Sequence, residues 1–177
     1  MIRHFLIILC IIVPTLSQAS GWQEARDRHG ANVVFLRHAL APGYGDPDNF
    51  TIADCATQRN LNEVGRKQAE NIGRRMRAEG FVFSEILSSQ WCRCKETAMH
   101  LDVGEWQGFD GLNSFFQGHV DKQKTIKLLN EKLSKIPEGH FVLMVTHQVV
   151  ISEITGIAPQ SGGAVLYDTA TKQARIW

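Results

Sequence analysis

The chain alternates short apolar runs with segments in which apolar residues recur every three or four positions. Runs rich in β-branched residues predict buried strands, and the periodic segments predict helices with one buried face. The predicted strands are 31–36, 83–87 and 141–146, followed by a closing hairpin of 165–167 and 174–176. The predicted helices are 60 to about 80, 91–101, about 121–136 and 149–155. This alternation indicates an α/β fold of three layers, with helices on both sides of a mainly parallel central sheet.

The predicted helix that starts at residue 60 carries the most local signals. Asn60 and Glu63 have the spacing of a capping box in which Asn60 is the N-cap. Apolar residues recur on one face of this helix, and small residues allow another element to pack closely against it. The apolar positions are Leu61, Val64, Ile72 and Met76, and the small ones are Gly65, Ala69 and Gly73.

The first 19 residues follow a different pattern. A short segment with Arg3 as its positive charge precedes an almost unbroken apolar run over 5–16. That run is about a dozen residues long, whereas a helix needs ~20 to cross a bilayer. Ser17 and Ala19 then place small residues at the −3 and −1 positions of a cleavage site. We therefore expect a secretory signal peptide over 1–19, and the alternative is an uncleaved anchor.

Removal of the signal peptide would leave one domain, 20–177, which is exported to the periplasm or secreted, with no stable membrane association. The full length of 177 residues suits a single domain with its own core. A hydrophobic fraction of 44% and a charged fraction of 21% are typical of globular proteins. The net charge is only +1 and no charged tail is present, so the composition indicates no nucleic-acid partner.

Three cysteines remain after the signal peptide: Cys55, Cys92 and Cys94. In an oxidising compartment, an odd number allows one disulfide and leaves one thiol. Cys92 and Cys94 are too close in sequence to be the obvious pair, so we expect Cys55 to bridge to one of them. The alternative is three buried, reduced thiols, because free cysteine packs as a small hydrophobic residue.

Polar side chains gather at the ends of three predicted strands. Arg37 and His38 end the first strand, Ser89 ends the second with Arg93 one turn into the next helix, and His147 ends the third. Ligands of open α/β sheets bind at the carboxyl ends of the strands. Two arginines, two histidines and a helix N-terminus at one such edge would suit a dianionic phosphate.

His38 extends this hypothesis from binding to catalysis. A histidine attacks phosphorus in line when its far ring nitrogen holds a hydrogen bond that fixes the tautomer. Arg37, Arg93 and His147 would then hold the equatorial oxygens as charge redistributes, and neither a metal nor a cofactor would be required. Taken singly, each residue also has an ordinary interpretation as a helix cap or a solvated ion-pair partner.

Four segments, in order along the chain, resemble the histidine phosphatase superfamily, which has the phosphoglycerate-mutase-like fold. They are Phe-Leu-Arg-His at 35–38, L-x-x-x-G-x-x-Q-A at 61–69, S-S-x-x-x-R-x-x-x-T-A at 88–98 and Val-Thr-His at 145–147. The resemblance implies that His38 is the nucleophile. It implies a phosphate clamp of Arg37, Arg93 and His147, with Arg59 and Ser89 as further substrate-binding candidates.

The sequence departs from the superfamily pattern at the general acid. Gln148 follows the second histidine, where one branch of the superfamily has aspartate. The other branch places a glutamate between Arg93 and His147, a stretch that here offers Asp102, Glu105, Asp110 and Asp121. Asp110 is the favoured candidate because it follows a predicted strand over 105–109, although an aspartate before glycine also forms turns. Without an acid, esters with alkoxide leaving groups should react slowly.

Two functions therefore remain open. The first is a phosphohydrolase that acts on a small-molecule or glycan phosphate through a phosphohistidine on His38. The second is a non-catalytic phosphate- or phosphoglycan-binding module on the same fold. Motifs of other hydrolases and of nucleotide-binding loops, such as H-E-x-x-H, G-x-S-x-G and G-x-x-x-x-G-K-[ST], do not occur.

Overall fold

The predicted strands assemble into one six-stranded sheet in the computed structural model, which describes residues 30–177. The strands are β1 (Val33–Arg37), β2 (Glu85–Ser88), β3 (Gln107–Gly108), β4 (Val142–Thr146), β5 (Ala164–Tyr167) and β6 (Ala174–Ile176), in the spatial order β3-β2-β4-β1-β5-β6. The first four pair in parallel. β5 and β6 form the predicted hairpin and extend the sheet antiparallel to β1. The predicted signal peptide lies outside the described residues.

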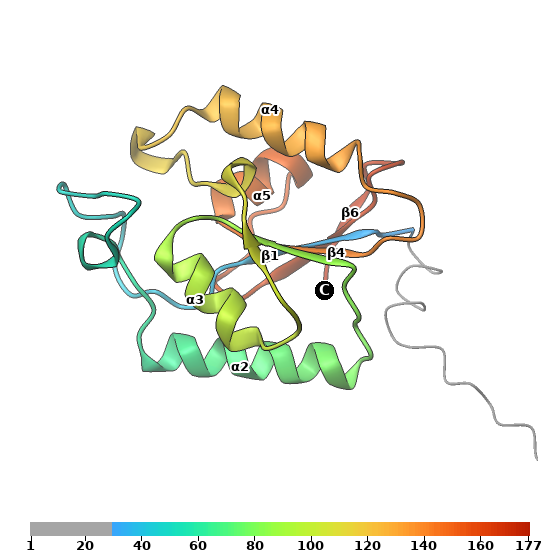
Figure 1. Ribbon diagram of the computed structural model, residues 1–177, viewed down its shortest axis with the longest axis horizontal. Helices are drawn as coiled ribbons and strands as arrows, with labels where there is room; N and C mark the ends of the chain where they lie inside the picture. Colours follow the sequence, from blue (N-terminus) through green and yellow to red (C-terminus); the bar gives the residue numbers. More distant parts are fainter. Residues whose placement is uncertain (1–29) are drawn as a thin grey trace, which may run out of the picture.

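Helices cover both faces of this sheet (Figure 1). They are α2 (Glu63–Ala78), α3 (Cys92–Leu101), α4 (Lys122–Leu133) and α5 (Gln148–Thr155). Successive residues of β1 point to opposite faces, so Val34 packs in one core with Met76 of α2, and Val33 in the other with Leu129 of α4. The three-layer α/β fold is therefore confirmed. No helix within residues 30–177 is long and apolar enough to span a bilayer.

Helix α2 begins later than its capping box predicts. The N-cap is Asn62, whose side chain accepts a hydrogen bond from the backbone N–H of Gly65 at 2.9 Å. Asn60 is wrong as the N-cap because its amide donates to the carbonyls of Cys55 and Gln58 and so closes the preceding turn. Val64, predicted to be in the core, is 61% exposed.

The small residues of α2 are confirmed as points of close approach. A Cβ atom on Gly65 would collide with the carbonyl oxygen of Leu40, and one on Gly73 would collide with that of Leu101. Gly65 therefore lets the first turns of α2 rest against the chain that follows β1. Because Gly65 has no side chain, the backbone that follows β1 can lie directly against α2.

One disulfide joins Cys55 to Cys92, with the two Cα atoms 5.7 Å apart, while Cys94 is a buried free thiol. The expectation that Cys55 pairs with one of the other two cysteines is confirmed. The bridge connects the loop before α2 to the first residue of α3. It therefore links the loop that leads to Arg59 with the residue directly before Arg93.

We predict that loss of this disulfide lowers the free energy of unfolding. The bridge closes a loop with a sequence separation of 37, which corresponds to about 4 kcal/mol in the loop-entropy model. Urea unfolding of the wild type should shift to lower concentration when reductant is added. A Cys55→Ser/Cys92→Ser variant serves as the control, since reductant should not change its midpoint. Equal midpoints for oxidised and reduced wild type would contradict the prediction.

Candidate active site

The register of the parallel strands brings the predicted site to one edge of the sheet. Arg37 at the end of β1 pairs with Thr146 of β4, and Ser88 at the end of β2 pairs with Val145. The three strands therefore end side by side. The residues that directly follow them are neighbours as a result: His38, Ser89 and His147.

His38 is buried, and its tautomer is fixed by the backbone. Its Nδ1 lies 2.7 Å from the carbonyl oxygen of Ala39. Because a carbonyl can only accept, Nδ1 carries the ring proton and Nε2 keeps its lone pair. Burial, and then the charge of Arg93, lower the pKa of His38 to about 3. The imidazole is thus neutral near pH 7, which is the state that nucleophilic attack requires.

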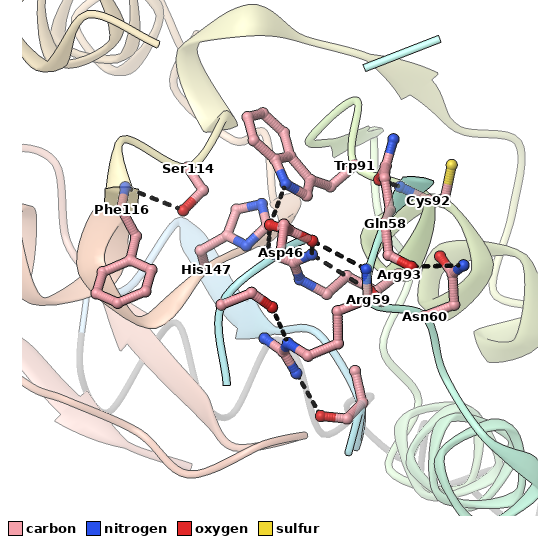
Figure 2. A network of polar contacts seen from close by, with 12 residues as sticks. Asp46, Gln58, Arg59, Asn60, Trp91, Cys92, Arg93, Ser114, Phe116 and His147 are labelled. Atoms are coloured by element: carbon pink, nitrogen blue, oxygen red, sulfur yellow. Dashed lines mark hydrogen bonds and ion pairs between the residues drawn. The ribbon is translucent and has the colours of Figure 1, made fainter. Parts of the chain in front are cut away.

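Arg93 is held in place by a carboxylate from the loop after β1. Its Nη1 and Nη2 donate to the two carboxylate oxygens of Asp46 at 2.7 and 3.2 Å. The same carboxylate accepts from the Trp91 indole N–H and from the backbone N–H of Arg59, both at 3.0 Å (Figure 2). Burial raises the pKa of Asp46, but the hydrogen bonds from Arg93, Arg59 and Trp91 and the charge of Arg93 together outweigh this effect, and the pKa lies below its usual value. The pair is therefore ionised.

Arg37 and Arg59 bring two more guanidinium groups to this edge. Arg37 donates to the carbonyl of Pro159 at 2.9 Å, and Arg59 donates to that of Gly45 at 2.8 Å. Burial, followed by the charge of Arg93, lowers the pKa of both groups. The lowered pKa values thus reflect burial first and the nearby positive charge of Arg93 second.

Two donors in this arginine cluster have no partner among the described residues. They are the buried Nε atoms of Arg37 and Arg93. An unpaired buried donor on a charged group is costly, so the cluster suits a ligand that supplies acceptor oxygens. A phosphate dianion has both the oxygens and the charge that would relieve the repulsion among the arginines.

His147 lies against His38, with the ring centroids 5.5 Å apart. Its Nε2 is 2.9 Å from the hydroxyl of Ser89, which in turn donates to the Asn113 side-chain oxygen at 3.1 Å. That oxygen also accepts from the backbone N–H of Gln90, which fixes the orientation of the amide. Ser89 therefore accepts a hydrogen bond from Nε2 of His147. Ser89 was predicted to bind substrate, but its hydroxyl is hydrogen-bonded to His147 and Asn113.

The site opens into a cavity of about 400 Å³. Its basic lining consists of Arg37, His38, Arg59, Arg93 and His147. The remaining wall is apolar or uncharged, and no aspartate or glutamate of residues 30–177 contributes to it. Within the same residues, no three His, Cys, Asp or Glu side chains gather as a metal site would require.

Asp110 does not reach this cavity. The predicted strand over 105–109 is reduced to the residue pair of β3, and Asp110 begins a short 3-10 helix, Asp110–Leu112. Its side chain is exposed, and its carbonyl accepts from the backbone N–H of Asn113 to close a turn. The structure thus places the favoured general acid in a turn. The other candidates are also exposed and outside the cavity lining: Asp102, Glu105 and Asp121.

Two residues of the predicted motifs hold the backbone beside His38. The Thr97 hydroxyl accepts from the N–H of Ala39 at 3.0 Å, and the Gln68 side chain accepts from the N–H of Leu40 at 2.8 Å. Thr97 also donates to the carbonyl of Arg93 at 2.6 Å. These two motif residues therefore position the backbone that follows His38 and do not line the cavity.

Asp46 is the site residue that sequence reasoning missed. It lies in a loop, 41–49, that contains two prolines, two glycines and two aspartates, so it resembles an ordinary turn residue. Its partner Arg93 is 47 positions away. The only signal in the sequence is that a buried arginine needs a partner.

The sequence comparison agrees with this geometry. Residues 33–131 match the histidine phosphatase superfamily (branch 1), and because the match spans more than half of the chain, this protein belongs to that superfamily. The matched segment contains His38, Arg59 and Arg93 and ends before His147, which the fold adds to the same site. No curated protein sequence matches the chain.

Solved structures share the fold at low sequence identity. The protein histidine phosphatase SixA in complex with tungstate has a TM-score of 0.54 at 16% identity, over 82% of this chain and 93% of SixA. A mycobacterial glucosyl-3-phosphoglycerate phosphatase has a TM-score of 0.59 at 14% identity, over 83% and 97%. A phosphoserine phosphatase from Entamoeba histolytica has 0.55 at 14%, over 81% and 93%.

We predict that Asp46→Ala destabilises the protein by about 3–5 kcal/mol, because it leaves the Arg93 charge buried without its partner. Urea unfolding measures the difference. Asp48→Ala is a matched control, since Asp48 is exposed in the same loop, and its effect should stay within about 0.5 kcal/mol. Equal stability of the two variants would show that Asp46 does not support the cluster.

Proposed function

We propose that this protein is a phosphohydrolase that transfers the phosphoryl group of its substrate to Nε2 of His38 and then to water. One observation carries the proposal. The neutral His38, with its proton committed to Nδ1, lines the same cavity as two arginines whose buried Nε donors lack acceptors. Such an arrangement provides a nucleophile and an oxyanion site together.

In the first step, the lone pair on Nε2 attacks phosphorus, and the bond from phosphorus to the leaving atom breaks with its electron pair on that atom. In the second step, water attacks the phosphohistidine, the P–N bond breaks, and its electrons return to Nε2. One proton of the water is released and inorganic phosphate leaves. The guanidinium groups of Arg37, Arg59 and Arg93 stabilise the equatorial charge, so these steps require neither metal nor cofactor.

His147 would join the phosphate clamp through a change of charge. Burial, and then the charge of Arg93, lower the pKa of His147 well below its usual value, so it is neutral in the free protein. Its Nε2 proton is directed to Ser89. A bound dianion would raise the pKa of this imidazole, and uptake of a proton on Nδ1 would then provide another donor to the phosphate.

The cavity lining favours leaving groups that depart without a proton. It contains no carboxylic acid, and a general acid typically contributes 10²–10⁴-fold to the departure of an alkoxide. Phosphohistidine, anhydrides and aryl esters need such help least. Phosphorylated small molecules and phosphorylated side chains are both compatible with this requirement, and the names of the similar structures include both kinds of substrate.

We propose that this activity takes place outside the cytoplasm, after export of the protein. The apolar run over 5–16 and the small residues before Ser20 are typical of a secretory signal. A disulfide between Cys55 and Cys92 is consistent with an oxidising compartment, because such bonds are rare in the cytosol. Phosphorylated compounds outside the cytoplasm would then be the available substrates.

We predict that His38→Ala abolishes turnover, because the replacement removes the atom to which phosphorus bonds. The measurement is phosphate release from a panel of phosphorylated compounds. His140→Ala, at an exposed histidine, should retain wild-type activity. Rapid quenching of the wild type should also trap an acid-labile, base-stable phosphoenzyme that His38→Ala lacks.

Full turnover by His38→Ala would refute the phosphohistidine mechanism. The second candidate function, a non-catalytic phosphate-binding module, makes a different prediction. The wild type would then bind tungstate in calorimetry, yet would release no phosphate from any compound and form no phosphoenzyme.

We also predict that Asp110→Asn changes neither alkyl phosphate nor p-nitrophenyl phosphate hydrolysis by more than about twofold, because the side chain is exposed and outside the cavity. The ratio of kcat/KM for the two substrates measures the effect. Loss of alkyl phosphate hydrolysis by ~10²-fold, with p-nitrophenyl phosphate spared, would instead identify Asp110 as the general acid.

A further inference from the structure

An exposed tyrosine and a half-buried phenylalanine form an aromatic pair in the cavity lining. Tyr44 is 88% exposed, and its ring meets that of Phe116 edge to face, with centroids 5.3 Å apart and an interplanar angle of 86°. Both residues line the same cavity as His38. Burial cannot explain why a tyrosine is held in this position, since most of its surface faces solvent.

The loop around Tyr44 is shaped by its neighbours. Gly43 and Gly45 both have positive φ, at 94° and 69°, and so turn the chain sharply on either side of Tyr44. Arg59 Nε donates to the carbonyl of Gly45 at 2.8 Å. The Gln117 side chain accepts from the next backbone N–H of the loop at 2.7 Å. An arginine of the phosphate site therefore fixes the loop that presents the tyrosine ring.

The lining of the cavity is of two chemical kinds. The arginines and histidines suit a phosphoryl group. Apolar and aromatic side chains also line the cavity: Leu40, Pro42, Tyr44, Phe116 and Val149. A volume of about 400 Å³ lies within the range of small-molecule sites and exceeds the needs of a phosphate alone. The apolar and aromatic side chains are thus available to the group that the phosphate leaves behind.

We propose that Tyr44 and Phe116 form a subsite for a flat leaving group, so that the preferred substrates carry phosphate on an aromatic ring. The proposal rests on the phosphohydrolase function above. Two independent features support it. Aromatic side chains stabilise other rings by offset or edge-to-face contact. A phenol oxygen, or the nitrogen of an imidazole ring that is protonated on its other nitrogen, also departs more readily without a general acid than an alkoxide does.

The test compares two substrates and two variants of the full-length protein. Phenyl phosphate is the aromatic substrate, and the matched one is a fluorinated alkyl phosphate whose alcohol is about as acidic as phenol. Tyr44→Ala should lower kcat/KM for phenyl phosphate about 3- to 10-fold and leave the fluoroalkyl ester within about twofold. Tyr44→Phe should behave like the wild type, because it keeps the ring and removes only the hydroxyl.

Three results would overturn the subsite: equal losses on both substrates, no loss on phenyl phosphate, or a loss in Tyr44→Phe as large as that in Tyr44→Ala. The last would mean that the hydroxyl donates a proton. His38→Ala, assayed in parallel, keeps the two proposals separate, because it should abolish hydrolysis of both substrates whatever Tyr44 does. Phosphoimidazole is a third substrate, which carries its phosphoryl group on a ring nitrogen instead of a phenol oxygen. A similar loss of its hydrolysis in Tyr44→Ala would support the subsite.

Discussion

The buried ion pair between Arg93 and Asp46 is the interaction on which this site depends. Three arginines at one sheet edge repel each other, and burial removes the water that would screen them. The Asp46 carboxylate offsets one of these charges and uses both oxygens to align the Arg93 guanidinium. It also accepts from the backbone of Arg59, so a single carboxylate sets the spacing of two arginines. The buried Nε donor of Arg93 has no partner among residues 30–177.

His38, the proposed nucleophile, is also positioned by few groups. The ladder between β1 and β4 brings His38 to the sheet edge, and Thr97 and Gln68 each accept one backbone N–H of the chain that follows it. Gly65 permits this arrangement because any side chain there would collide with Leu40. These residues belong to the motifs that resemble the superfamily, and each has a structural role here. They hold the backbone that carries Nε2 toward the cavity.

The composition of the cavity connects mechanism with specificity. In the function we propose, a lining with five basic residues and no Asp or Glu of residues 30–177 would favour substrates whose leaving group is already a good anion. The aromatic pair of Tyr44 and Phe116 would favour leaving groups with a flat face. Both properties would then select for the same chemistry. Arg59 connects them, since it lines the cavity and holds the loop that bears Tyr44.

Local signals in the sequence were sufficient for the elements and for most of the site. Apolar runs and helical periodicity predicted the layers, and the positions of His38, Arg93 and His147 after strands followed from them, because parallel strands end at a common edge. The predicted N-cap of α2 was wrong by two residues, because Asn60 and Asn62 are both suitable caps by sequence. Only the folded turn shows that the Asn60 amide donates to the carbonyl of Cys55 instead. Cys92 and Cys94 were likewise both plausible partners for Cys55, and only the folded structure shows that Cys92 is the one within bonding distance.

Tertiary structure alone decided the contacts between segments that are distant in sequence. Asp46 and Arg93 meet across 47 positions, and Ser89 reaches Asn113 across 24, with no periodic pattern to mark either pair. The exclusion of Asp110 from the cavity also required the fold, because a two-residue β3 places it in a turn. Periodicity reports which face of an element is buried. It carries no information about which loop side chain will neutralise a buried charge, because that depends on how separate elements pack together.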